Sequence, residues 1–128
     1  MAKSRKDNNT DMGGLFDPAA SRTQWLKGVL ELCLLGVVVE GEVYGYEITH
    51  RLEAAGLGVI KGGTLYPRLV AMEKSGLVEV EWRVGDHGPG RKYYTATPAG
   101  VTAFKEAVAE YEQFSASVAQ LISTTLHD

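Results

Sequence analysis

The chain has 128 residues, of which 45% are hydrophobic and 23% charged, and this composition suits one ordinary domain with a real core. Its formal charge of −3 excludes a uniformly basic nucleic-acid-binding protein. The single cysteine, Cys33, excludes an internal disulfide, and no apolar run approaches the ~18–20 residues that cross a bilayer. Together with a polar N-terminus unlike a signal peptide, these features predict a cytoplasmic protein.

Positive charge is gathered in two segments of the chain, although the total is negative. Residues 61–96 carry six basic and four acidic side chains, and residues 1–27 carry five basic and three acidic ones. Acidic side chains dominate the segments between and after them. This distribution provides a modest electrostatic footprint for a polyanion in the middle of the chain.

The first half of the chain predicts a polar tail followed by two helices. Residues 1–22 are expected to form a flexible N-terminal tail. From Thr23 apolar residues recur at spacings of three and four, which indicates an amphipathic helix. A second helix is expected over residues 44–55, because Ile48 and Leu52 lie four positions apart on one face.

A short helix with strong boundary signals follows in the stretch GGTLYPRLVAMEKSGL, which spans residues 62–77. Thr64 is the expected N-cap, Pro67 is expected in the first turn, and Gly76 is the expected stop. A helical projection predicts one buried face and an opposite face that is small, smooth and positive. The expected buried residues are Leu65, Leu69 and Met72, and the expected outward residues are Pro67, Ala71 and Lys74.

After Gly76 the apolar period changes to two residues. The alternation in LVEVEWRV and the second run RKYYTAT predict a β-hairpin over residues 77–96, with GDHGPGRK as its turn. Thr97 followed by Pro98 predicts the start of a long helix that runs to about residue 126. Its apolar residues alternate steps of three and four, a spacing typical of helices that pair with another helix.

The order helix, helix, short helix, hairpin, long helix predicts a mostly α (α+β) fold of the winged helix-turn-helix type. We expect a DNA-binding domain of this type at residues 23–96 and a C-terminal dimerisation helix at residues 97–128. The long helix has an apolar seam too long for so small a domain to cover, which predicts a homodimer. The expected interface residues are Leu26 on the first helix and Phe104, Val108, Tyr111, Ser115, Val118 and Ile122 on the last.

The short helix has the features of a recognition helix that enters the major groove of double-stranded DNA. Its N-terminal residues are expected to approach base edges, Ala71 permits close approach, and Arg68 and Lys74 can meet phosphates or guanine edges. In a dimer, two such helices one helical turn apart can read a palindromic operator. The alternative interpretation is a capped surface helix beside an ordinary hairpin, with solvated charges.

Three blocks of the sequence resemble the hallmark blocks of PadR-type transcriptional regulators. They are VYGYEITHRL at residues 43–52, GTLYPRLVAMEKSGLVE at residues 63–79 and GPGRKYYTATPAG at residues 88–100. The resemblance implies a winged-helix dimer joined through its N- and C-terminal helices, usually a repressor that a small molecule releases from DNA. The fairly short C-terminal helix is similar to that of the smaller subfamily.

The resemblance also points to individual DNA-binding residues. It implies that five positions of the first two blocks lie at or beside the DNA surface, and that Arg91 and Lys92 form the basic end of the wing. Lys61, Lys74 and His87 are added to these because of their charge or their place in the turn. The expected set is Tyr44, Lys61, Thr64, Tyr66, Pro67, Arg68, Lys74, His87, Arg91 and Lys92.

Two tryptophans and the cysteine call for separate interpretation. Trp25 and Trp82 either stack on a flat small-molecule effector near the dimer centre or anchor the core or the interface. Cys33 shares an apolar stripe and is expected to be a buried hydrophobe without a redox role. The histidines lack the spacing of a zinc site, and no nucleophile–base set is present, so we expect no metal, no cofactor and no enzymatic activity.

Two alternative functions stay open. A winged-helix module that binds another protein keeps the dimer helix but needs no basic cluster, and a constitutive architectural DNA binder needs no effector. Salt-sensitive binding to duplex DNA separates protein binding from DNA binding, because phosphate contacts release counterions.

Overall fold

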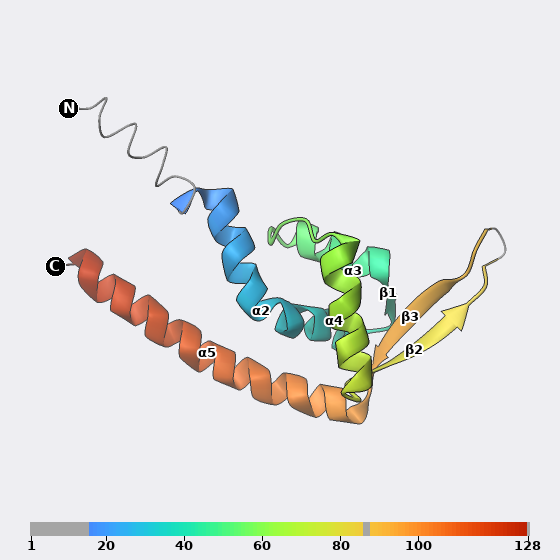
Figure 1. Cartoon of the computed structure of the whole chain (residues 1–128). Coiled ribbons are helices and arrows are strands. Elements are labelled where there is room, and N and C mark those ends of the chain that lie inside the picture. The colour runs from blue at the N-terminus through green and yellow to red at the C-terminus, as the bar shows by residue number, and fades with distance from the viewer. Residues whose placement is uncertain (1–15, 86–87, 128) are drawn as a thin grey trace.

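The computed structural model describes residues 16–85 and 88–127 (Figure 1). The described elements are α2 (Pro18–Glu40), β1 (Val43–Tyr44), α3 (Gly45–Ala54), α4 (Gly62–Lys74), β2 (Val78–Arg83), β3 (Arg91–Ala96) and α5 (Pro98–His127). This order confirms the predicted winged helix-turn-helix, with the β2–β3 hairpin as its wing. In the described part of the chain, no helix is both long and apolar enough to span a membrane.

The core lies where α2, α3 and α4 pack together and against the base of the sheet. Its most buried side chains come from all three helices: Leu30, Leu34, Ile48, Leu65 and Leu69 are at most 1% exposed. The predicted inner face of α4 is therefore confirmed, and Met72 is buried with it. In Figure 1 the wing and the C-terminal half of α5 extend from this core in opposite directions.

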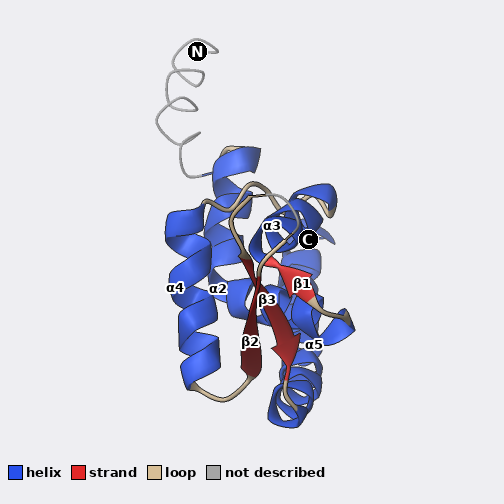
Figure 2. Cartoon of the chain, turned by 90° about the vertical axis from the view of Figure 1, so that its right-hand side faces the viewer, coloured by secondary structure: helices blue, strands red, loops and turns tan. Residues whose placement is uncertain are grey.

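The three strands form one antiparallel sheet in which β3 lies between β1 and β2 (Figure 2). The register pairs Trp82 with Lys92, so these two side chains share one face of the wing. Arg83 pairs with Arg91, and both therefore lie on the opposite face. The strand β1 is not predicted by the sequence, because two residues are too few to show a period.

The first described helix begins earlier than predicted. Asp17 caps it by accepting a hydrogen bond from the backbone N–H of Ala20 at 3.2 Å, and Pro18 takes the first helical position. The predicted start at Thr23, and with it the tail boundary at residue 22, is therefore wrong. The cause is the same cap-plus-proline signal that starts α5, here hidden in a polar stretch. The rest of the predicted tail, residues 1–15, lies outside the described residues.

The predicted recognition helix, α4, also begins earlier than predicted. Lys61 precedes it, and the Lys61 carbonyl accepts from the N–H groups of both Thr64 and Leu65 at 2.9 Å. Thr64 is thus a residue of the first turn and the prediction that it is the N-cap is wrong. Pro67 lies inside the helix rather than in its first turn. Because proline has no N–H, it removes one intrahelical hydrogen bond there.

The long helix α5 is confirmed, with Thr97 as its N-cap: the Thr97 hydroxyl accepts from the N–H of Gly100 at 3.0 Å. Two of the expected dimer contacts, Leu26 of α2 and Phe104 of α5, are used within one chain instead. Leu26 is only 5% exposed in the core, so its assignment to the interface is wrong. The ring of Phe104 packs against α2, where a Cβ at Gly36 would lie 3.0 Å from its Cε1 atom.

Candidate nucleic-acid interface

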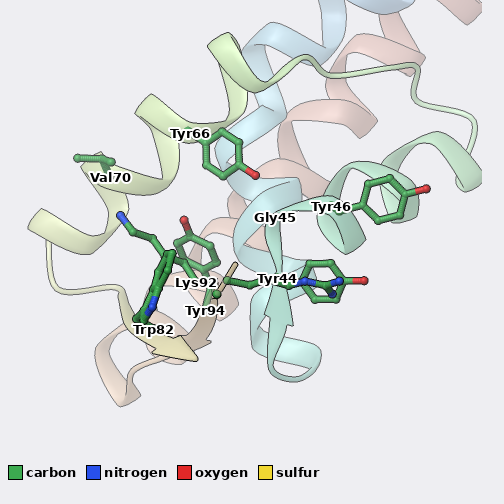
Figure 3. Close-up of a pocket in the computed structure, with 10 residues that line it drawn as sticks. Tyr44, Gly45, Tyr46, Tyr66, Val70, Trp82, Lys92 and Tyr94 are labelled. Atoms are coloured by element: carbon green, nitrogen blue, oxygen red, sulfur yellow. The ribbon is translucent and has the colours of Figure 1, made fainter. Parts of the chain in front are cut away.

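A cleft of about 690 Å³ lies between α4, the wing and the start of α3. Figure 3 shows Tyr66 and Val70 of α4 on one side of it and Trp82 and Lys92 of the wing on the other. Its remaining lining residues are Tyr44, Gly45, Tyr46, Gly90, Arg91 and Tyr94. Four tyrosines, one tryptophan and two cations therefore converge beside the predicted recognition helix, and this combination suits a polyanion with flat rings.

The wing supplies Trp82 and Lys92 because the strand register places them side by side. The side chain of Trp82 is 58% exposed, so its indole ring is accessible to a ligand in the cleft. Gly90 lets this ring lie across the start of β3, since a Cβ there would come within 2.6 Å of the Trp82 Cε2 atom. Tyr94 lies deeper on the same face, and its burial, followed by the neighbouring Tyr66 and Glu73, raises the pKa of its hydroxyl. That hydroxyl therefore remains protonated.

Tyr66 is placed by a close contact between α4 and α3. A Cβ at Gly45 would overlap the Tyr66 hydroxyl oxygen and come within 2.9 Å of its Cε1 atom, so any larger residue at position 45 would force the phenol to shift. Tyr66 itself is 46% exposed, which leaves its ring accessible from the cleft. The predicted position of Tyr66 beside the DNA surface is thus consistent with an exposed ring at the cleft.

Arg91 lies where the wing meets the start of α3. Its guanidinium carbon is 4.3 Å from the centroid of the Tyr44 ring, within the range of a cation–π contact. The stacking holds Arg91 and Tyr44, two of the sequence-based candidates, together at one end of the cleft. His87, the third wing candidate, lies outside the described residues.

The outward face of α4 is exposed and smooth. Lys61, Thr64, Pro67 and Lys74 are all exposed, and the row includes Val70, which is 40% exposed. The predicted contrast between a buried and an outward face is confirmed. This exposed row leaves the backbone of α4 open to close approach by a groove.

Arg68 does not share the outward face of α4. Its Nη1 donates to a carboxylate oxygen of Glu31 on α2, and only 30% of the Arg68 side chain is exposed. Arg68 therefore forms part of the α2–α4 contact, and its role in DNA recognition stays a prediction. Any contact with DNA requires this ion pair to open or to share the guanidinium.

Five lining residues of the cleft were not among the sequence-based candidates: the glycines Gly45 and Gly90, and the side chains of Tyr46, Val70 and Tyr94. Signals in the sequence point to two of these residues. Tyr94 alternates with Lys92 along β3, and Val70 follows Pro67 by three positions on α4. Tyr46 is 68% exposed and stacks against Tyr44, a contact that follows from the turn into α3 and not from any period.

The two tryptophans are not brought together within one chain. Trp25 is 68% exposed on α2, whereas the cleft that Trp82 lines contains no residue of α2. Trp82 therefore belongs to the α4–wing cleft. The role of Trp25 at an interface or an effector site stays a prediction.

The C-terminal half of α5 has an apolar row that the chain itself does not cover. Tyr111, Val118 and Ile122 of the predicted seam are 41%, 40% and 53% exposed, whereas Val108 and Ser115 are half-buried. The row is wider than predicted, because Phe114, Leu121 and Leu126 are 64%, 70% and 78% exposed beside it. A surface of this kind on a helix indicates an interface with another helix.

Cys33 packs against the core as a small hydrophobe, but it is less buried than predicted. It is half-buried against the core, and burial raises the pKa of its thiol, which disfavours the reactive thiolate. Within residues 16–85 and 88–127 the structure holds no group of three side chains suited to a metal ion.

Comparisons with known proteins agree with this geometry. Residues 34–106 match the model of the transcriptional regulator PadR-like family. The transcriptional regulator Rv3488 of Mycobacterium tuberculosis is 39% identical over 83 residues, which cover 65% of this chain and 76% of that protein. A PadR-like regulator from Bacillus cereus is 37% identical with a TM-score of 0.69, covering 77% of this chain and 96% of that one.

Two further solved structures share the fold. A PadR family regulator from Eggerthella lenta has a TM-score of 0.73 at 29% identity, covering 84% of this chain and 96% of that one. Bacillus subtilis PadR, solved with operator DNA, has a TM-score of 0.58 at 24% identity, covering 62% and 45%. The family consists of regulators and not of enzymes, as the sequence predicted. With more than half of its length matched by the family model, the chain belongs to the PadR-like family of transcriptional regulators.

Proposed function

We propose that this protein binds double-stranded DNA in a sequence-specific manner, with α4 in the major groove and the wing along the backbone. The observation that carries the proposal is the cleft between α4 and the wing, which places Arg91 and Lys92 beside four tyrosines and Trp82. Cations meet phosphates, and the exposed rings among these, those of Tyr46, Tyr66 and Trp82, offer contact with sugars and bases. Bacillus subtilis PadR, which has the same fold, was solved in complex with operator DNA, and this supports DNA as the partner.

A partner protein is a weaker alternative for this cleft. Interfaces between proteins are depleted in lysine at their centre, whereas here Lys92 lies on the cleft wall next to the exposed ring of Trp82. The outward face of α4 adds two more exposed positive side chains, Lys61 and Lys74. The proposal therefore assigns the surface to DNA.

The proposal includes a homodimer that reads a palindromic operator in the cytoplasm. The exposed apolar row on α5 supports it, because Phe114, Leu121 and Leu126 are each more than half exposed in the single chain. Association through this row would place two copies of α4 on the same DNA, where half-sites lie about one helical turn, ~34 Å, apart.

We further propose that the protein is a repressor under the control of a small molecule bound near the dimer interface. Trp25 supports an effector site on α2, since its indole is 68% exposed and offers a flat apolar surface. An effector there is expected to change tryptophan fluorescence and to release the protein from DNA at the same concentration. A Trp25→Phe variant that keeps DNA binding but loses the fluorescence change would report on this site alone.

Replacing Lys92 by glutamine should weaken binding to specific and random duplexes alike. If Lys92 neutralises one phosphate, the slope of log K against log salt concentration should become less steep by about 1. Fluorescence anisotropy across a salt series measures both quantities. The matched control is Lys105→Gln, which removes the same charge from an exposed position of α5. If the two variants behave identically, Lys92 contributes only net charge and is not a contact.

A further inference from the structure

One arginine of the wing is held by two carboxylates on the side away from α4. Arg83 Nη1 donates to Glu42 Oε1 at 2.7 Å, and its Nη2 donates to the other Glu42 oxygen. Arg83 also donates to Glu81 Oε1, from Nε at 3.0 Å and from Nη2 at 2.6 Å. Glu81 lies on the same strand, but Glu42 lies in the link between α2 and β1. The paired hydrogen bonds from Arg83 to Glu42, which we call the fork, therefore tie the end of β2 to the helical body.

The same arginine begins a row of stacked groups. Its guanidinium carbon is 4.5 Å from the centroid of the Tyr93 ring, and that ring meets the Tyr44 ring edge-on at 5.6 Å. Tyr44 in turn carries the guanidinium of Arg91 at 4.3 Å. Arg83, Tyr93, Tyr44 and Arg91 thus form one continuous row across β2, β3 and β1, which we name the wing stack.

The two arginines at the ends of the wing stack have different charged neighbours. Arg83 faces two carboxylates, whose hydrogen bonds raise the pKa of its guanidinium above the ordinary value, so the group around it has a net negative charge. Arg91 starts from the same face of the wing as Arg83, but its guanidinium rests on the neutral phenol of Tyr44 at one end of the cleft. A cation already matched by two anions gives little net attraction to a phosphate, whereas an arginine on a ring keeps its charge available.

We propose that Arg83 is a positioning residue for DNA binding, which holds the wing and Arg91 in place through Glu42, Tyr93 and Tyr44 without contacting the DNA. This inference rests on the proposed DNA-binding function. It assigns a structural use to Glu42 and Glu81, two negative charges that otherwise only repel a polyanion.

Replacing Glu42 by alanine tests the inference by the sign of its effect. If the carboxylate acts only through its charge, its removal should strengthen DNA binding and free Arg83 for a phosphate. If it positions the wing, its removal should weaken binding, by about fivefold to thirtyfold for one disturbed contact network.

The matched control is Glu79→Ala, which removes the same charge from the outer face of β2, where Glu79, Glu42 and Glu81 line one shallow cleft. In the described part of the chain, the side-chain hydrogen bonds of Arg83 go to Glu42 and Glu81, so Glu79→Ala leaves them in place. Tighter binding by Glu42→Ala, or an equal change in both variants, would overturn the inference.

Replacing Arg83 itself by lysine and by methionine separates position from charge. Both variants are expected to weaken binding to a similar extent, because lysine keeps the charge but cannot form the paired hydrogen bonds to Glu42. A phosphate contact by Arg83 itself would instead give full or partial rescue of binding in Arg83→Lys. Arg91→Met is the comparison variant, in which the slope of log K against log salt concentration should become less steep by about 1.

Amide hydrogen exchange without DNA keeps this test independent of the proposed function. In Arg83→Met the amides of β3 are expected to exchange at least about tenfold faster than in the unmodified protein, since the local opening energy falls. In Glu79→Ala they should exchange at the unmodified rate. Unchanged exchange in Arg83→Met would overturn the positioning role even if the protein proves to bind no DNA. Faster exchange with no DNA binding in any variant would instead contradict the proposed function alone.

Discussion

Replacing Val118 and Ile122 together by glutamate is expected to convert a homodimer into a monomer. Both side chains are partly exposed in the single chain, at 40% and 53%, so the substitutions should leave the fold of one chain intact. In a helix–helix interface the same charges would be buried without partners, which costs far more than association through one seam can offset. Sedimentation should therefore report half the mass of the unmodified protein in solution.

The DNA-binding consequence of the same pair is also large. Monomers can occupy only one half-site at a time, so affinity for a palindromic operator should fall by roughly 10²- to 10⁴-fold. The control is the pair Gln113→Glu and Gln120→Glu, which adds the same charge to exposed positions on the opposite side of α5. A dimer that persists in the Val118 and Ile122 variant would show that α5 does not join the two copies.

Replacing Gly100 by alanine should destabilise the protein by about 3 kcal/mol, the upper part of the range for overpacking. Gly100 is buried in the first turn of α5, where a Cβ would overlap the carbonyl oxygen of Leu77 and lie 3.0 Å from its carbonyl carbon. The obstacle is backbone, and that backbone is held because the Leu77 carbonyl accepts from the N–H of Thr97 at 3.0 Å. The first turn of α5 therefore has to move to remove the overlap between the new Cβ and the Leu77 carbonyl.

Denaturant unfolding at matched protein concentration measures this loss, which corresponds to a drop in Tm of roughly 10 °C. Gly28→Ala is the control, since it makes the same substitution in a helix at an exposed position with no atom near the new Cβ. That variant should be more stable by about 0.5–1 kcal/mol, because alanine loses less backbone entropy than glycine. Equal stability of the two variants would mean that α5 leaves the domain by another route.

Most of the architecture is readable in the sequence because it depends on local signals. The alternation after Gly76 predicts the hairpin, and Thr97 with Pro98 predicts the start of α5; both are confirmed. The errors come from two other helix starts. Asp17 with Pro18 carries the same signal within a polar stretch. At α4 the backbone carbonyl of Lys61, and not a side chain, accepts the hydrogen bonds of the first N–H groups.

The candidate site is less predictable, because its contacts join distant parts of the chain. Charge and resemblance place Lys92 and Arg91 at the surface, but no period reveals that Arg68 pairs with Glu31, which lies 37 positions away on another helix. The fork from Arg83 to Glu42 spans 41 positions in the same way. Such ion pairs depend on how the elements pack, and packing decides which of several exposed cations face the DNA.

Sequence-specific DNA binding is tested most directly by fluorescence anisotropy of the purified protein on its own upstream DNA and on a scrambled duplex of equal length. We predict tight binding to the upstream fragment, much weaker binding to the scrambled one, and a steep fall of affinity with salt as counterions are released. Weak and equal binding to both duplexes at low salt would contradict the assignment of the α4–wing cleft to specific DNA recognition.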